Sequence, residues 1–76
     1  MTQRLCHVFT KSLELPAETD AATLQRDFVE SWDSLAHISL ITAIENEFDL
    51  IFNADDYARI TSFEAVVEIL QARGIE

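Results

Sequence analysis

Glycine and proline are nearly missing from this 76-residue chain, which holds one of each, Gly74 and Pro16. Folds built of many short strands need such residues at their turns, so this scarcity argues against a turn-rich β fold. It favours helices joined by polar loops. The length is that of one domain, and apolar residues, at 49%, are enough for one modest core. We therefore expect a single all-α domain over residues 1–76, with little room for a deep enzyme cleft.

Cysteine occurs once, as Cys6, and long apolar runs do not occur. A lone cysteine excludes an internal disulfide framework and a cysteine metal cluster, and we assign Cys6 no role beyond packing. No apolar run approaches the roughly 20 residues of a membrane span, and the N-terminus lacks the continuous apolar segment of a signal peptide. We expect no membrane span and a reduced, cytoplasmic location.

Basic residues are scarce as well, because 5 lysines and arginines stand against 14 acidic residues, giving a formal charge of −9. Nucleic-acid backbones repel such a surface, and so do anionic membrane surfaces. We expect no nucleic-acid partner. The natural partner is a protein with a basic patch, because electrostatic steering raises the rate at which such a protein associates with an acidic chain.

The first helix is expected over residues 2–13, where Leu5, Val8, Phe9 and Leu13 recur at helical spacing. It should stop before Pro16, since the residue before a proline disfavours the α region.

A long loop without a clean period follows over residues 14–33. Loops of this length in a compact domain are functional or disordered. Disorder is not expected for this loop, because four apolar residues can anchor it to the bundle. A short helical turn is expected near residues 21–26. The anchors are Leu24, Phe28, Val29 and Trp32.

Three further helical segments are expected after the loop, over 34–48, 55–59 and 63–73. The middle one is short and has acids at its start, where they favour a helix. Thr61-Ser62 precedes the last and can cap it. The chain thus predicts a small antiparallel four-helix bundle, with three main helices and one short helix.

Two apolar stripes run along the expected helix 34–48. One stripe faces inward and consists of Leu40, Ile41, Ile44 and Phe48. Together with apolar residues of the later segments it makes up the expected core, and those residues are Ile60, Phe63, Val66, Val67 and Leu70. The other consists of Leu35, Ile38 and Thr42, near the helix start on a different face. We expect it to be an exposed apolar strip of the kind that marks a partner surface. The alternative is that loop residues such as Trp32 cover it.

Two metal sites can be tested from spacing, and both fail. An EF-hand loop beginning at Asp49 needs an oxygen ligand third, Gly sixth and Glu twelfth, where the chain has Ile51, Ala54 and Ile60. The histidines and Cys6 lack zinc-ligand spacing. We expect no bound metal.

Ser34 and His37 are spaced to share a helix face, which raises the alternative of a serine hydrolase. Such a site needs a group that orients the base, an oxyanion hole and a serine on a glycine-flanked turn, and none is evident. We therefore expect no catalytic residue, no enzyme, and a solvent-facing His37. Asp33 or Ser34 should cap the helix, and the residues alone leave Ser34 open between a simple cap and a functional serine.

From Phe28 to about Leu70 the chain resembles the acyl carrier protein family. The motifs in register are Asp33-Ser34-Leu35, Leu40, Ala43-Ile44-Glu45, Glu47-Phe48-Asp49, Asp55-Asp56 and Ile60-Thr61-Ser62-Phe63.

The resemblance implies that Ser34 carries 4′-phosphopantetheine, which a phosphopantetheinyl transferase attaches from coenzyme A with magnesium held in the transferase. The arm holds acyl or aminoacyl groups as thioesters, supplied by a loading enzyme and passed to transferases or synthases. A monomeric, free-standing carrier of fatty-acid, polyketide or related specialised synthesis is implied, with a core that can open to shelter an acyl chain.

Partner recognition is implied for Asp33, Leu35, Ile38, Thr42, Glu45 and Glu47. The chain departs from the family in having Trp32 directly before the motif and neutral residues on the helix where acids are common, at Ala36, Ser39 and Asn46. Partners that recognise the helix by charge should therefore bind more weakly. The alternative from another class is an unmodified helical interaction module without a prosthetic group.

Overall fold

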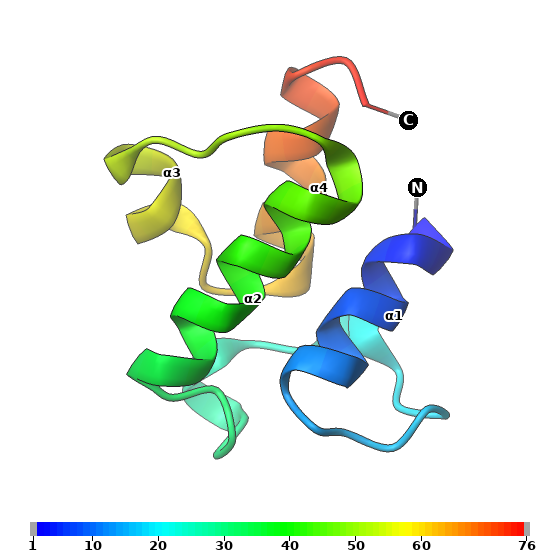
Figure 1. The fold of residues 1–76 in the computed structure, drawn as a ribbon. Helices are drawn as coiled ribbons and strands as arrows, with labels where there is room; N and C mark the ends of the chain where they lie inside the picture. Colours follow the sequence, from blue (N-terminus) through cyan, green and yellow to red (C-terminus); the bar gives the residue numbers. More distant parts are fainter. Residues whose placement is uncertain (1, 76) are drawn as a thin grey trace.

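The computed structural model describes residues 2–75 and is built of four α-helices (Figure 1). They are α1 (Thr2–Ser12), α2 (Ser34–Phe48), α3 (Ala54–Arg59) and α4 (Phe63–Ala72). Two single 3₁₀ turns, η1 (Ala21–Thr23) and η2 (Arg26–Phe28), lie in the long loop. The predicted small all-α bundle, with three main helices and one short helix, is confirmed.

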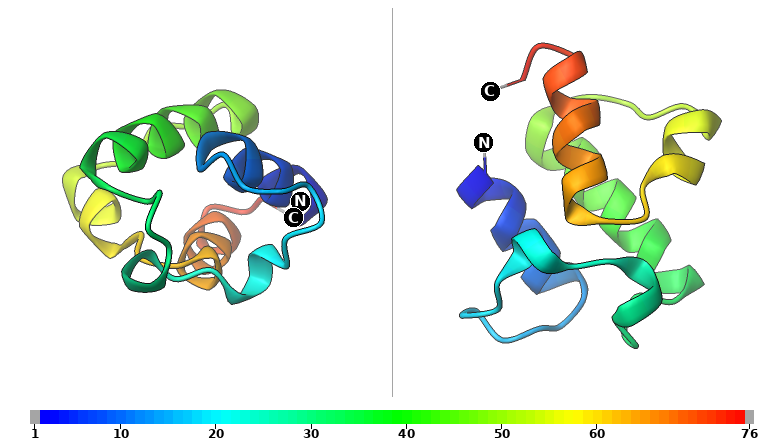
Figure 2. Two further views of the ribbon diagram at one scale, coloured as in Figure 1. Left: turned by 90° about the horizontal axis from the view of Figure 1, so that it is seen from below. Right: turned by 180° about the vertical axis from the view of Figure 1, so that it is seen from behind.

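The helices α1 and α2 pack side by side and run in opposite directions (Figure 1). The connector after α2 crosses the molecule to α3, and the chain then turns back past the middle of α2 before α4 begins (Figure 1). As a result α4 runs in the same general direction as α2 (Figure 2). The antiparallel arrangement is therefore correct for α1 and α2 and wrong for α2 and α4.

A residue with left-handed backbone conformation follows each of the first two long helices. Glu14 follows α1 with φ 55°, and Asp49 follows α2 with φ 53°. This backbone turn lets the next amide reach back into the helix, as when the Leu50 N–H donates to the Glu45 carbonyl at 3.1 Å. The chain therefore leaves α1 one residue earlier than expected from its apolar period.

Side-chain caps begin the other helices. The Asn53 side chain accepts from the Asp56 N–H and the Asp56 side chain accepts from the Asn53 N–H, a capping box that fixes the start of α3. The Ser62 hydroxyl accepts from the Ala65 N–H at 3.0 Å, so the predicted cap of α4 is confirmed.

The long loop is held against the start of α4. The Arg26 N–H donates to the Thr61 carbonyl at 2.8 Å, and the Phe63 N–H donates to the Leu24 carbonyl at 3.0 Å. Leu24 and Trp32 are buried anchors, as predicted. Phe28 is 82% exposed, so its prediction as an anchor is wrong. It ends η2, and Trp32 fills the interior instead.

The core is centred on Phe9 of α1. Its ring meets Trp32 edge-on at 5.5 Å and Phe63 at 5.1 Å between centroids, which joins α1, the loop and α4. Seven of the nine residues predicted for the core are buried. Phe48 and Val67 pack against it at the edge and are half-buried.

Replacing Phe9 with alanine should remove most of the stability of the fold. Emptying a buried phenylalanine site costs about 3–5 kcal/mol, and a domain of this length has about 4–11 kcal/mol in all. Urea unfolding followed by circular dichroism measures the change. Ile51→Ala is the control, since Ile51 is 80% exposed, and a similar loss in both variants would contradict the packing described for Phe9.

Candidate functional site

Ser34 is the first residue of α2, and its side chain is exposed. The residue before it, Asp33, has an extended backbone, and its carboxylate accepts from the Ala36 N–H at 2.9 Å. Asp33 is therefore the N-cap, which settles the choice between the two residues. The Ser34 hydroxyl is left at an exposed helix start without the capping task.

The start of α2 suits a phosphodiester on the Ser34 hydroxyl. The Asp33 carbonyl accepts the first helical bond, from the His37 N–H at 2.8 Å, so the amides of Ser34 and Leu35 precede the helical hydrogen-bond ladder. Together with the helix dipole they make this end electropositive, which favours an attached anion. The residues present thus fit the phosphate end of a 4′-phosphopantetheine arm.

A chain of two hydrogen bonds, one buried and one part-buried, runs through His37, three residues after this serine. The Trp32 indole Nε1–H donates to Nδ1 of His37 at 2.9 Å, and Nε2 of His37 lies 3.1 Å from the Tyr57 carbonyl oxygen. An indole N–H can only donate and a carbonyl can only accept. His37 therefore carries its proton on Nε2, and one ring joins the loop, α2 and α3.

The prediction that His37 faces solvent is wrong, because its side chain is 1% exposed. His37 precedes Leu40, Ile41 and Ile44 by three, four and seven positions, which places it on the inward face of α2. That spacing, together with a buried Trp32 in need of an acceptor, is the sequence signal for its burial. Both ring nitrogens are engaged, so neither is left to bind the Ser34 hydroxyl as a catalytic base.

Burial lowers the pKa of His37 below its ordinary value of 6.5, since the charged form is poorly solvated there. The hydrogen bond to Tyr57 raises the pKa by a smaller amount, and the positive charge of Arg26 lowers it further. Protonation would also place a second N–H on Nδ1, opposite the N–H of Trp32. The neutral ring is the form that the network requires.

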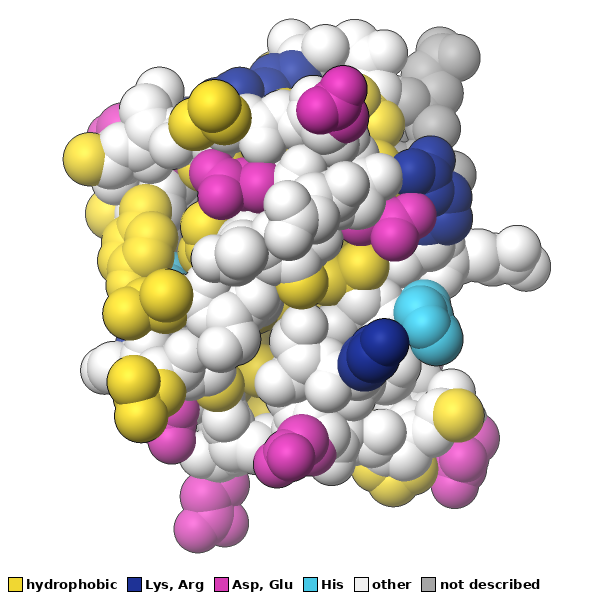
Figure 3. Space-filling view, viewed as in Figure 1, with side chains coloured by type: hydrophobic (Ala, Val, Ile, Leu, Met, Phe, Trp, Pro, Cys, Tyr) yellow, Lys and Arg dark blue, Asp and Glu magenta, His cyan; other side chains and the backbone are white. Residues whose placement is uncertain are grey.

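The strip of Leu35, Ile38 and Thr42 is exposed on α2. Leu35 is 78% and Ile38 52% exposed, while Trp32 is buried and does not cover them. Hydrophobic side chains gather along this edge of the molecule, over the first half of α2 and toward α3 (Figure 3). The predicted exposure of the strip is confirmed.

The two glutamates of α2 already have partners within the chain. The Glu45 carboxylate accepts from the Phe52 N–H at 2.8 Å and is half-buried. The Glu47 carboxylate accepts from Arg4 at 2.7 Å, in an ion pair between α1 and α2. Asp33, at the other end of α2, is exposed beside Ser34. The recognition role implied for the two glutamates thus has to compete with these internal contacts.

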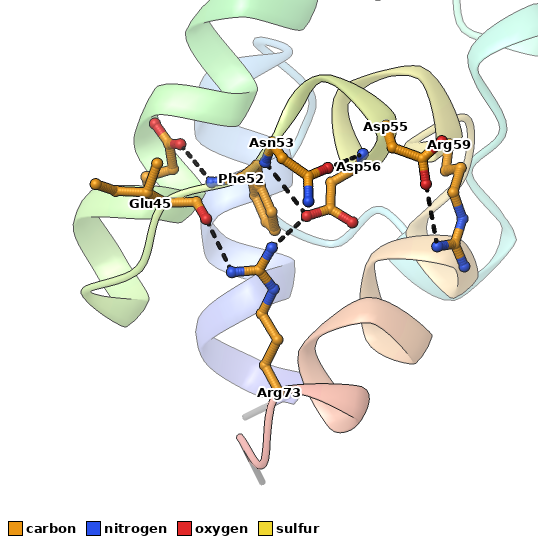
Figure 4. Close-up of polar contacts among 8 residues, drawn as sticks. Glu45, Phe52, Asn53, Asp55, Asp56, Arg59 and Arg73 are labelled. Atoms are coloured by element: carbon orange, nitrogen blue, oxygen red, sulfur yellow. Dashed lines mark hydrogen bonds and ion pairs between the residues drawn. The ribbon is translucent and has the colours of Figure 1, made fainter.

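A cluster that local sequence patterns do not reveal holds α3 in place (Figure 4). Arg73, at the end of α4, donates to the Ile51 carbonyl at 2.8 Å and pairs with the buried carboxylate of Asp56. Its guanidinium also lies over the Phe52 ring, 5.5 Å from the centroid. Arg73 and Asp56 are 17 residues apart in the sequence, so the spacing of residues within one helix could not predict their contact.

A groove of about 450 Å³ lies between α1 and α2 and is lined by His7, Lys11, Ala43 and Asn46, among others. Ala43 is nine residues beyond Ser34, roughly 13 Å along the helix, so the groove is separate from the serine. Residues 2–75 contain no cluster of three metal-ligating side chains. In the same part of the chain, no helix has the length and apolarity to cross a membrane.

Comparisons with known proteins add no assignment, since no protein-family model matches the chain and no curated protein gives a significant match. Its function is therefore inferred from the site itself.

The buried state of His37 should make stability depend on pH. Well above pH 6.5 the ring is neutral in both the folded and the unfolded chain. Below pH 6.5 the unfolded chain binds the proton more readily than the folded chain, so the protein becomes less stable as the pH is lowered. One proton contributes at most about 1.4 kcal/mol per pH unit.

Urea unfolding of the native chain and of His37→Gln, from about pH 7.5 to about pH 5, measures this effect. The native chain should be the more stable at the upper end, and the difference should shrink as the pH falls. Ser39→Gln, a substitution without an ionisable group at an exposed position, is the control and should keep a constant difference from the native chain. A constant difference for His37→Gln would contradict its buried neutral state.

Proposed function

We propose that this chain is a carrier protein modified on Ser34 with 4′-phosphopantetheine. It holds acyl or aminoacyl groups as thioesters and delivers them to partner enzymes of a fatty-acid, polyketide or related specialised pathway. The observation that carries the proposal is an exposed serine at the first position of α2, released from capping by Asp33 and followed by the exposed residues Leu35 and Ile38. The register of the acyl-carrier motifs supports it.

Modification needs little from the chain beyond an accessible hydroxyl. In the active site of a phosphopantetheinyl transferase, Ser34 Oγ loses its proton and gains the phosphodiester bond, while coenzyme A releases its adenosine bisphosphate. When bound, the arm supplies a terminal thiol that carries acyl groups as thioesters. The chain itself presents the serine, and its carrier role consists in raising the effective concentration of cargo at partner active sites.

The strip on α2 is the surface offered to these partner enzymes. Burying a leucine or isoleucine completely is worth about 1.5–3 kcal/mol, so Leu35 and Ile38 together can support a transient complex that releases its carrier. The acidic surface favours basic partner faces. A lone cysteine and the net charge fit a monomer in a reduced, cytoplasmic location.

Intact mass after incubation with coenzyme A, magnesium and a broad-specificity phosphopantetheinyl transferase tests the modification. The native chain should gain one phosphopantetheine, and Ser34→Ala should gain none. Ser31→Ala is the matched control, since Ser31 is an exposed serine three residues earlier and should leave the gain unchanged. A folded native chain that stays unmodified by an active transferase would refute the carrier and favour the unmodified interaction module.

Ile38→Asp should slow modification at least about tenfold, which corresponds to about 1.4 kcal/mol of lost binding to the transferase. Its melting temperature should stay nearly unchanged, because the side chain is 52% exposed. Ser39→Asp adds the same charge at the neighbouring exposed position and should modify at close to the native rate. Equal slowing in both variants would assign the effect to charge, and a large loss of stability would place Ile38 in the core.

A further inference from the structure

The short helix α3 is fastened to the bundle near both of its ends. Near its C-terminal end, the Tyr57 carbonyl accepts from Nε2–H of His37, and the Tyr57 ring meets the His37 ring edge-on at 4.6 Å. His37 is held in turn by the indole of Trp32. Separating α2 from α3 on this side would break this part-buried hydrogen bond and expose the buried ring of His37.

A second set of contacts fastens the N-terminal side of α3 (Figure 4). Arg73, directly after α4, binds both the Ile51 carbonyl and the Asp56 carboxylate, and Glu45 of α2 binds the Phe52 N–H. Asp56 is 6% exposed, so its charge depends on Arg73 for compensation. The connector and α3 are thereby attached to both long helices that flank them.

The interior behind these contacts is already filled. Leu40, Ile44, Ile60 and Val66 have no exposed surface, and protein interiors pack as densely as organic crystals. A hydrocarbon chain inserted from Ser34 between α2 and α3 would have to displace these side chains. It would also separate the N–H of His37 from the carbonyl of Tyr57, and the N–H of the buried ring would then face methylene groups without a hydrogen-bond partner.

We infer that the acyl group stays outside the bundle, and that the carrier takes cargo which needs no shelter from water, namely short or polar acyl groups such as aminoacyl and hydroxyacyl groups. This inference rests on the proposed modification of Ser34. It excludes long saturated chains as the natural cargo, because their methylenes would remain in contact with water throughout delivery.

The test compares two cargoes on the native chain. The transferase loads Ser34 with stable octanoyl or glycyl analogues of the arm from the matching coenzyme A derivatives, and intact mass confirms each product. The methyl and amide NMR chemical shifts of Ile44, Ile60 and Val66 are then compared with those of the modified chain whose arm ends in a free thiol. Both cargoes should leave these core signals in place and move only signals near Ser34, with melting temperatures within about 2 °C of each other.

Octanoyl-induced shifts of the core methyl groups, with a melting temperature raised by more than about 4 °C, would overturn the inference, because a sheltered chain stabilises the state that holds it. A chain that the transferase does not modify would instead refute the proposed function. That failure is visible in the mass spectrum before any cargo is compared.

A pair of arginine variants tests the cause. Arg73→Met removes the contacts with Asp56 and Ile51, whereas Arg59→Met removes only the exposed pair with Asp55, whose charged atoms are 3.8 Å apart. Octanoyl should shift the core signals of Arg73→Met and leave those of Arg59→Met in place. If Arg73→Met also excludes the octanoyl chain, the fastening of α3 is not what keeps cargo outside, and that part of the inference fails.

Discussion

The imidazole of His37 can bind the indole of Trp32 and the carbonyl of Tyr57 at once only in one tautomer and one orientation. Nδ1 accepts from Trp32, and Nε2–H donates to the Tyr57 carbonyl. Buried polar groups must be paired, and within residues 2–75 every buried side-chain nitrogen and oxygen has a partner. Rotating the ring, or moving the loop or α3 away from it, would leave the other groups unpaired. The relative positions of the loop, α2 and α3 therefore depend on this ring.

The same ring explains how an exposed serine can be well positioned. Trp32 and His37 stand two residues before and three residues after Ser34, and both are buried. Asp33 fixes the intervening turn by capping α2. The hydroxyl projects from a short segment anchored on each side, so the proposed partner enzymes would meet it in one geometry. Positioning of this kind depends on the supporting residues more than on the serine itself.

Periodicity was enough to predict the elements, most of the core and the exposed strip, because each depends on residues within two turns of one another. The range of α2 and the cap of α4 follow from such local patterns. The partners of His37, Glu45 and Arg73 were not predictable in this way, since each lies on another element and pairs through tertiary packing. Phe28 was wrongly predicted to be buried, because a loop has no helical periodicity from which the orientation of an apolar side chain can be inferred.

Charge and apolar contact have separate parts in how this surface would meet a partner. The net charge of −9 acts at long range and raises the rate of encounter with a basic protein. At short range the two glutamates of α2 are held by Arg4 and by the Phe52 amide, so a partner's basic side chain has to share each carboxylate with an existing contact. Leu35 and Ile38 have no such competitor and release ordered water when covered. Affinity should therefore depend on the apolar strip, while the acidic surface sets the rate of association and its sensitivity to salt.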